Sequence, residues 1–340
     1  MKQHAMRLVY LAYYLRHLDR ERLDAFMTHL SGIKGWSRLG QWRRIVWDSM
    51  RFNISILEYF QFRFFELSDD QKASWAGTGT MYEFQRRANP PGQRNILDDK
   101  CLFHEAYRDF FRHDVATLSE LEEDPELAAR MRAAHSHLVF KPARGNCGIG
   151  IAFVESASLP EGQLSSWMRT HGYDLVEERV PQHADLQALS PSGVNTVRIF
   201  TALDNKDRCR IIGCRLRISV ASAVDNLAAG NLAAPVDDAT GRVSGPGVYS
   251  DMTKQPRPVH PVTGVPIKGF QIPFWAETLE LARKASLAHP QNRSIGWDIV
   301  ITPDGPGLIE GNHDWCKLVW QLPVRRGLKH LLEECDKNAR

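Results

Sequence analysis

Three oxygen-bearing side chains near the end of the chain have the spacing of a metal site. Asp298 precedes a turn centred near residues 304–305, and Glu310 and Asn312 follow it. In an antiparallel hairpin Asp298 lies across from Glu310 and Asn312, which share one face because strand side chains alternate. Carboxylate and amide oxygens suit Mg²⁺. Alternatively, these carboxylates could lie on the solvent-exposed face of a hairpin at the edge of a sheet. The other residues of both strands are strongly apolar, which favours the metal site.

A lysine and a glycine-rich loop follow one another in the middle of the chain. The apolar run Leu138–Phe140 precedes Lys141 and the loop at residues 145–150. Glycines let backbone N–H groups turn toward an anion, and a lysine at the end of a strand supplies a point charge to phosphate. The loop lacks the ending of a P-loop, and a strand rather than a helix follows it. Two interpretations stay open: a lid over a nucleotide, or a structural β-turn beside an incidental lysine.

Three arginines alternate along two β-rich runs. Arg198 lies in the first run, and Arg215 and Arg217 lie in the second. Arginines that alternate on strands are usually exposed to solvent. Phosphoryl transfer nevertheless needs guanidinium groups that point into the phosphate site, because its catalysis depends mostly on positioning and charge stabilisation.

The elements that must position these residues change in kind along the chain. Leucines at helical spacing from Leu8 to Leu18 and similar patterns further on predict a helical region over the first ~95 residues. Another helix is expected from Lys100, and the acidic segment Ser119–Ala134 begins with a capping-box pattern of Ser119 and Glu122. From Leu138 onward, short β-rich runs alternate with turns, and a helix is expected over Ala276–His289. This order predicts an antiparallel α+β fold rather than a doubly wound parallel sheet.

Composition excludes several classes of protein. The chain has 340 residues, 43 Lys and Arg against 40 Asp and Glu, and 43% hydrophobic residues, which excludes intrinsic disorder and predicts two or three folded units. No apolar run approaches the ~20 residues that span a bilayer, and we expect a cytoplasmic protein. Six cysteines without a C-x-x-C pair indicate reduced thiols.

The basic charge is concentrated at the N-terminal end. Residues 1–65 hold eleven Lys and Arg against five Asp and Glu, together with Trp36, Trp42 and Trp47. Such a segment could contact nucleic acid, an anionic glycan or a membrane surface. The simpler interpretation is a solvated helical face with core tryptophans, because charge runs alone specify no partner.

In their order along the chain, these segments resemble the ATP-grasp superfamily and, within it, the sugar-transfer-associated ATP-grasp proteins. The resemblance covers about residues 98–320. Three phrases point to the sugar-transfer-associated set: His260-Pro261, the run at residues 269–273, and Gly296-Trp297-Asp298. It implies two α+β subdomains that clamp ATP behind a helical N-terminal region, with boundaries at residues 1–97, 98–180 and 181–340.

The resemblance also implies roles for individual residues. Lys100 and Lys141 would bind phosphates beneath a lid formed by Gly145, Gly148 and Gly150. The hinge at residues 176–180, with Glu177, Glu178 and Val180, would pair with adenine, and Asp185 would take the ribose hydroxyls. Arg198 and Arg215 resemble arginines that line the transferred phosphate, and Asn226 resembles part of a loop near it. Asp298, Glu310 and Asn312 match magnesium ligands.

The activity implied by the resemblance is ATP- and Mg²⁺-dependent joining of a carboxylate to an amine through an acyl phosphate, in glycan modification or specialised-metabolite biosynthesis. The substrates would be small molecules or groups linked to a glycan or peptide, with no nucleic acid partner. A small-molecule or glycan kinase and a non-catalytic ATP-grasp binding protein are the alternatives. No general base stands out, and His260 and His313 are candidates only by position. A homodimer is expected from base rates alone.

Overall fold

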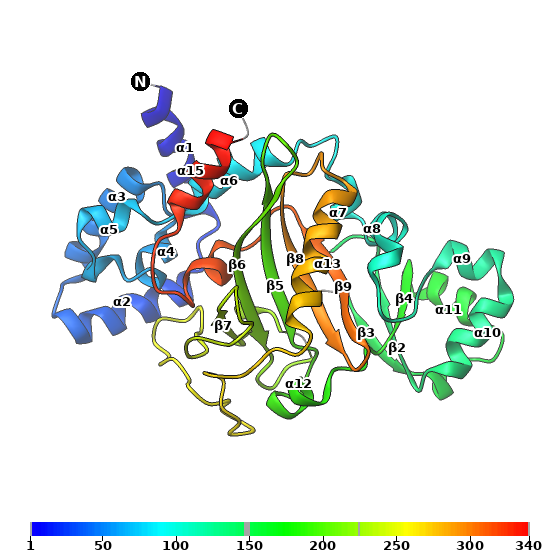
Figure 1. Ribbon diagram of the computed structural model, residues 1–340. Coiled ribbons are helices and arrows are strands. Elements are labelled where there is room, and N and C mark those ends of the chain that lie inside the picture. The colour runs from blue at the N-terminus through cyan, green and yellow to red at the C-terminus, as the bar shows by residue number, and fades with distance from the viewer. Residues whose placement is uncertain (1, 146–149, 224, 339–340) are drawn as a thin grey trace.

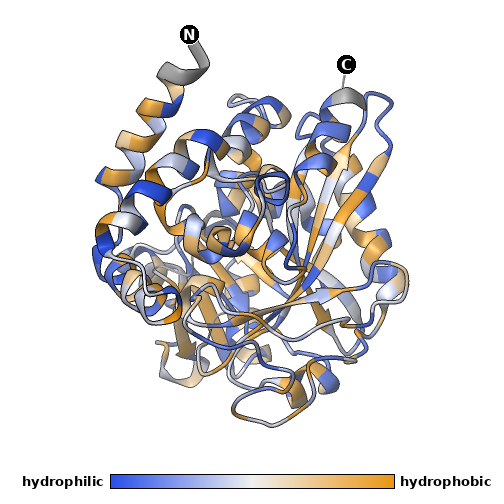
Figure 2. Cartoon of the chain, turned by 90° about the vertical axis from the view of Figure 1, so that its left-hand side faces the viewer, coloured by the Kyte–Doolittle hydropathy of each residue, from blue (hydrophilic) through white to orange (hydrophobic). Residues whose placement is uncertain are grey.

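The computed structural model describes residues 2–145, 150–223 and 225–338. Helices gather at one side, a five-stranded sheet occupies the middle, and a four-stranded sheet with its own helices lies at the other side (Figure 1). The expected α+β fold with a helical N-terminal region is confirmed. Hydrophobic residues run along the strands of the large sheet, while the helices alternate between hydrophobic and hydrophilic positions (Figure 2).

The N-terminal region is helical, as expected. Polar N-cap residues start several of its helices; Asp19 and Ser37, for example, each accept a hydrogen bond from the first turn, which satisfies amide groups that lack a helical partner. Aromatic side chains such as Phe26, Phe60 and Phe64 form its core. The elements are α1 (Lys2–Arg16), α2 (Arg20–Lys34), α3 (Arg38–Phe52), α4 (Ile56–Gln61), η1 (Phe64–Glu66), α5 (Asp69–Ala73) and α6 (Thr78–Ala88).

The smaller sheet is antiparallel, with the strand order β1-β4-β2-β3. Three helices on this subdomain complete its core. Its elements are β1 (Val115–Thr117), α9 (Leu118–Glu123), α10 (Pro125–Ala134), β2 (His137–Lys141), β3 (Ala152–Glu155), η3 (Ser156–Ser158), α11 (Leu164–His171) and β4 (Leu175–Glu178).

The capping box of this subdomain lies two residues earlier than the sequence pattern predicts. Thr117 and Glu120, not Ser119 and Glu122, form the reciprocal hydrogen bonds at the start of α9. Asp124 then ends α9 and caps α10, so the acidic segment forms two helices. Thr117 prevails because it ends β1, which fixes its extended backbone at the N-cap position.

The larger sheet is also antiparallel, in the order β7-β6-β5-β8-β9, and α13 packs against it. Its central strands β5 and β8 are buried along their whole length, which explains their nearly continuous apolar sequences. The elements are β5 (Thr196–Leu203), β6 (Cys209–Ile218), β7 (Leu232–Val236), α13 (Trp275–Ala288), β8 (Ser294–Thr302) and β9 (Gly305–Asn312).

The remaining elements connect these parts. A long irregular segment at residues 237–273 follows β7 and covers one end of the large sheet (Figure 1). No helix within the described residues is long and apolar enough to cross a membrane. The connecting elements are α7 (Asn95–Asp98), α8 (Lys100–Tyr107), η2 (Arg108–Phe110), α12 (Ala184–Leu189), η4 (Leu227–Ala229), α14 (Lys317–Gln321) and α15 (Lys329–Asn338).

Candidate active site

The hairpin of β8 and β9 places two carboxyl groups side by side. Asp298 pairs directly with Glu310, and the register shifts immediately after Asp298. The Asn312 amide donates a hydrogen bond to Glu310 Oε1 at 3.1 Å. Burial, the negative charge of Asp298 and a hydrogen bond with Asp298 together raise the pKa of Glu310 above its usual range. The pair therefore favours a shared proton or a bound cation over two free charges.

Two arginines hold Asp298 from the neighbouring strands. Arg198, directly opposite Asp298 on β5, donates from Nε and Nη2 to its two carboxylate oxygens at 2.5 and 2.7 Å. Arg217 on β6 donates to Asp298 Oδ2 at 2.7 Å. Burial alone would raise the pKa of Asp298, but the two guanidinium groups outweigh it and hold that pKa far below its usual range. Asp298 is therefore ionised at neutral pH.

Arg217 extends this ionic cluster to a second buried acid. Its other terminal nitrogen lies 2.7 Å from Asp225 Oδ1. The second oxygen of Asp225 accepts hydrogen bonds from the backbone N–H and the hydroxyl of Thr196, at 2.9 and 2.5 Å. Cations and anions thus alternate across β5, β6 and β8, which lets several charges stay buried together.

The two lysines singled out in the sequence lie on the opposite side of the same space. Lys141 Nζ, at the end of β2, is 2.6 Å from Glu177 Oε2 on β4. Lys100 Nζ, at the start of α8, donates to the carbonyl of Gly145 at 2.7 Å. Burial lowers the pKa of Lys100, the charge of nearby Glu310 raises it, and that of Lys141 lowers it further.

A small cavity of about 40 Å³ joins these groups. Lys100 and Lys141 line it from the small subdomain, and Glu310 and Asn312 line it from the large sheet. The structure thus brings together the predicted phosphate-binding lysines and two of the predicted metal ligands, although they are about 170 to 210 residues apart in sequence. Cationic groups that face carboxylates across a narrow space are suited to hold a polyphosphate and its metal ion.

Glu177 is the central acid of the small subdomain. It accepts from Lys141, and His113 Nε2 lies 3.5 Å from the same carboxylate oxygen. Burial opposes ionisation, but Lys141 and His113 outweigh it and lower the pKa of Glu177 to about 2. The His113 side chain is fully buried, and neither ring nitrogen has a hydrogen-bond partner among the described residues.

A second cavity of about 430 Å³ opens beside the lysine strand. Val139 and Phe153 supply apolar surface from β2 and β3, and Glu178 and Val180 of the predicted hinge line the same cavity. Asp225 and Thr196 also line it. A cavity of this size with apolar and polar lining suits a purine ring.

Other predicted nucleotide ligands have different positions. Asp185 is exposed on α12, and its carboxylate lies 3.6 Å from His183 Nδ1. It does not line the larger cavity, and its role with ribose stays a prediction. Gly150 has φ of +79°, a conformation that favours glycine, and Gly145 bonds to Lys100 through its carbonyl. Gly148 lies outside the described residues.

Arg215 and Asn226 face partners of their own. Arg215 shares a sheet face with Arg198, but its guanidinium donates to the main-chain carbonyls of Trp320 and Cys214, and burial lowers its pKa to about 10. The Asn226 side chain accepts from Ala228 N and so caps η4. No contact links either side chain to Asp298 within the described part of the chain.

The two histidines considered as bases also have local partners. His260 is buried, with Nε2 2.8 Å from the Ser219 carbonyl, and its Nδ1 accepts from backbone amides of the following turn. His313 Nε2 lies 2.7 Å from Asp98 Oδ1. These contacts fix loops rather than present a free nitrogen to the cavities.

The structure brings two further residues, Asp225 and His113, to the site, and it places Arg217, singled out from the sequence with Arg198 and Arg215, in the ionic cluster. Asp225 could have been chosen from its place beside Asn226. His113 gives no sequence signal, because only the fold brings it to Glu177.

The donor set at the hairpin fits a magnesium ion. Within the described ranges, no cluster of three or more His, Cys, Asp or Glu has the arrangement of a metal site. The candidate ligands are instead two carboxylates and one amide, from Asp298, Glu310 and Asn312. A carboxylate offers about four lone-pair positions, of which the arginines use three on Asp298. The shared hydrogen bond with Glu310 marks the place where a cation would replace a proton.

The fold and the site define an ATP-grasp protein. The family model described as sugar-transfer associated ATP-grasp matches residues 80–337. This match spans most of the chain, and the protein therefore belongs to the sugar-transfer-associated ATP-grasp family. The resemblance in the sequence motifs is confirmed. A search of curated proteins finds no match.

Solved structures show distant likeness. The chain is similar to biotin carboxylase from Campylobacter jejuni, at 12% identity and a TM-score of 0.46, covering 74% of this chain and 48% of that one. It is also similar to D-alanyl-alanine synthetase A from Vibrio cholerae, at 13% identity and a TM-score of 0.42, covering 72% and 65%, and to the VanG D-Ala:D-Ser ligase from Enterococcus faecalis, at 11% and 0.42, covering 72% and 62%. The chain thus spans about half the length of the first.

Proposed function

We propose that the protein is an ADP-forming carboxylate–amine ligase that works through an acyl phosphate. The observation that carries this proposal is the convergence of Lys100 and Lys141 with Glu310 and Asn312 around one small cavity, beside Arg198. Membership of the ATP-grasp family supports the use of ATP.

In the first step, an oxygen of the substrate carboxylate attacks the γ-phosphorus of ATP, the bond to the β–γ bridging oxygen breaks, and ADP leaves. Lys100 and Lys141 would neutralise phosphate oxygens, and the adjoining cavity of about 430 Å³ would hold the adenine. Arg198 and Arg217 would stabilise charge on the transferring group. This division suits phosphoryl transfer, in which positioning and charge stabilisation supply most of the catalysis.

Asp298, Glu310 and Asn312 would hold Mg²⁺, which when bound offsets the charge of the phosphates and orients them. Glu310 must lose its proton to serve as a ligand, and the adjacent positive charges of the two arginines keep Asp298 ionised.

In the second step, the amine attacks the acyl carbon, the bond to the phosphate oxygen breaks, and inorganic phosphate leaves. The amine loses one proton overall, and phosphate oxygens offer an acceptor for it. The family description supports substrates in glycan assembly, and a peptide-like acceptor in specialised metabolism is the related choice.

The experiment combines binding with turnover. Thermal unfolding of the purified chain should shift upward with ADP or ATP only when magnesium is present, because a ligand of the native state stabilises it by mass action. Carboxylate and amine pairs are then screened for phosphate release that requires both. Phosphate transfer to a single hydroxyl substrate would instead identify a kinase.

Glu310→Gln is the decisive variant, because it keeps the size of the side chain but removes the charge that holds the metal. We expect the magnesium-dependent shift to vanish while the unfolding temperature without ligand stays the same or rises, since Glu310 is strained by the charge of Asp298. Glu280→Gln on the exposed face of α13 is the matched control. Normal turnover in Glu310→Gln would refute the metal assignment.

A further inference from the structure

A third cavity, of about 450 Å³, lies between the N-terminal helices and the irregular segment after β7. Three stretches far apart in sequence form its walls: residues 61–75, 248–256 and 322–325. The first stretch precedes residue 80, where the match to the family model begins. One wall is therefore outside the residues that the family model matches.

The floor of this cavity is apolar and aromatic. Phe62 and Trp75 stack with ring centroids 4.4 Å apart, and Met252 and Leu322 continue this surface. Each of these side chains is largely buried, so they are held rigidly by the N-terminal core. Leu67 and Tyr249 also line the cavity and are only half-buried, so they supply the apolar surface that a ligand ring can contact.

The rim carries more positive than negative charge. Arg63 is neutralised by Glu66 through two hydrogen bonds at 2.6 and 2.7 Å. One carboxylate oxygen of Asp251 accepts hydrogen bonds from the backbone amide and the hydroxyl of Thr253. Lys254 and Arg325 form no ion pair within the described residues, and Lys254 lies only over the ring of Tyr249, at 5.0 Å.

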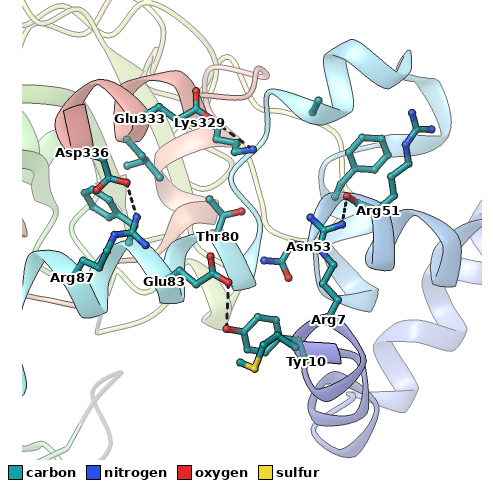
Figure 3. A pocket seen from close by; sticks show the side chains of 15 residues that line it. Arg7, Tyr10, Arg51, Asn53, Thr80, Glu83, Arg87, Lys329, Glu333 and Asp336 are labelled. Atoms are coloured by element: carbon teal, nitrogen blue, oxygen red, sulfur yellow. Dashed lines mark hydrogen bonds and ion pairs between the residues drawn. The ribbon is translucent and has the colours of Figure 1, made fainter. Parts of the chain in front are cut away.

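A larger cavity elsewhere shows the opposite arrangement. It has a volume of about 670 Å³ and lies between α1, α3, α6 and α15 (Figure 3). Its cations are already bound: Arg87 pairs with Asp336 at 2.5 Å, Lys329 with Glu333 at 3.7 Å, and Arg7 donates to backbone carbonyls of α3. Because each of these cations already has a partner, whereas Lys254 and Arg325 have no ion-pair partner among the described residues, the smaller cavity is the better anion site.

Hydrogen bonds connect one wall of the smaller cavity to the turn that follows Asp225. Gln61 donates to the carbonyl of Ser250, and the hydroxyl of Ser250 donates to the carbonyl of Leu227. Leu227 begins the turn η4, two residues after Asp225 of the ionic cluster. A Cβ on Gly230, at the end of this turn, would lie 4.0 Å from Lys254 Nζ. Lys254 thus lies beside the turn that follows Asp225 of the ionic cluster.

We propose that this cavity binds the acceptor substrate of the proposed ligase, and that the acceptor carries an apolar or aromatic ring and an anionic group. The ring lies against Leu67 and Tyr249, and a carboxylate or phosphate lies between Lys254 and Arg325. The role of the cavity as an acceptor site rests on the proposed function. The binding of a ring-bearing anion does not.

The test is direct binding to the full chain, measured by ligand-observed saturation-transfer NMR. Phenyl phosphate and benzoate are the probes, and they distinguish a phosphate from a carboxylate ligand. Phenol carries the ring alone, and inorganic phosphate carries the charge alone. We expect saturable binding of at least one ring-bearing anion, about tenfold or more tighter than either half, because charge-assisted hydrogen bonds and ring burial add.

Two substitutions remove the cations with little risk to the fold. Arg325 has φ of +52°, so Arg325→Gly relieves backbone strain while deleting the charge. Lys254→Gln keeps most of an exposed side chain. The double variant should bind the probes at least about tenfold more weakly, and Arg257→Gln, on the same segment but outside the cavity lining, should bind them normally.

Nucleotide binding separates this proposal from the proposed function. The double variant should keep the magnesium-dependent thermal shift with ADP, because neither residue lines the nucleotide cavities. Equal probe binding in the double variant, or no saturable binding of either probe to the native chain, would overturn the acceptor site. Probe binding without any nucleotide shift would instead overturn the ligase and leave the anion site in place.

Discussion

At the scale of single residues, the site depends on buried charges that are compensated in pairs. Lys141 and Glu177 form such a pair, with His113 beside the same carboxylate oxygen. Taking two charges out of water is costly, and the pair persists because each ion removes the penalty of the other. Removing one partner therefore lowers the free energy of unfolding by more than the intact pair contributes to it.

The first prediction concerns Lys141 as a phosphate ligand. Lys141→Ala should weaken binding of ADP by about ten- to a hundredfold, since a charge-assisted hydrogen bond contributes roughly 1.5–3 kcal/mol. Titration calorimetry with magnesium present measures it. Lys284→Ala, an exposed lysine on α13, should bind normally. Unchanged affinity in Lys141→Ala would remove this lysine from the nucleotide site.

The second prediction follows from the low pKa of Glu177. Because its pKa falls from the usual 4.5 to about 2 in the folded protein, its ionised form stabilises the fold above pH 4.5, and this contribution is lost as the pH falls toward 2. The shift corresponds to about 3 kcal/mol. Glu177→Gln should therefore lose about that much unfolding free energy at pH 7.

Urea unfolding at pH 7, 5 and 3 measures this difference. The gap between the native chain and Glu177→Gln should be full at pH 7 and 5 and smaller at pH 3, whereas the exposed Glu155→Gln should show no gap at pH 7. A gap that does not change with pH would mean that Glu177 contributes through its shape and not its charge.

At the scale of elements, local sequence patterns predicted helices and strands well, but they did not predict the contacts between residues far apart in sequence. The hairpin of β8 and β9 was predictable because a short turn fixes its register, and that register places Asp298 opposite Glu310. The start of α8 at Lys100 was predictable from its pattern, and Asp99 caps it. Elements with strong local signals therefore account for most of the fold class.

Contacts across the sheets depend on side-chain direction, which spacing alone does not give. Arg198, Arg215 and Arg217 share a face, yet Arg215 extends to Trp320 while the other two extend to Asp298. Likewise, Thr117 replaced Ser119 in the capping box because the strand before it fixed the backbone. The three-walled cavity beside Trp75 could not be foreseen, since its walls are joined only by the packing of distant segments.

The third prediction concerns the close packing of β8 against the C-terminal segment. A Cβ on Gly296 would lie 2.6 Å from Trp315 Cβ and 3.4 Å from Arg198 Cδ. Trp315 is buried and packs against Phe200, so it has little room to move. Gly296→Ala should destabilise the protein by roughly 1–3 kcal/mol through overpacking, and it should also disturb Arg198.

Chemical denaturation measures the stability, and the magnesium-dependent nucleotide shift reports on the site. Gly32→Ala in α2 is the matched control, because nothing lies within 4 Å of its new Cβ. This control should be neutral or stabilising by up to about 1 kcal/mol, since alanine favours a helix more than glycine. Equal stability of the two variants would show that β8 and Trp315 separate easily.

At the scale of the whole molecule, one buried ion pair joins the N-terminal helices to the ATP-grasp part. Lys317 Nζ at the start of α14 lies 2.9 Å from Glu58 Oε1 on α4. Glu58 also accepts from the Ser55 amide and from Thr78. Burial would lower the pKa of Lys317, but the charge of Glu58 outweighs it and raises that pKa.

The fourth prediction is that Lys317→Met lowers the unfolding free energy by roughly 3–5 kcal/mol, because it leaves the buried Glu58 carboxylate without a cation. The double variant Glu58→Gln with Lys317→Met should recover part of this loss, since a neutral amide still meets the amide and hydroxyl partners at less cost. Urea unfolding of the single and double variants measures the coupling.

The same pair decides whether the two parts unfold together. Val248, Met252 and Leu322 of the ATP-grasp part belong to the hydrophobic core of the N-terminal helices, so the two regions share apolar surface as well as this ion pair. In Lys317→Met the N-terminal helices should therefore unfold first. Probe binding at the cavity beside Trp75 should be lost before the magnesium-dependent nucleotide shift, because that cavity, unlike the nucleotide cavities, has a wall from the N-terminal helical region. Simultaneous loss of both would mean that the shared core alone keeps the molecule one cooperative unit.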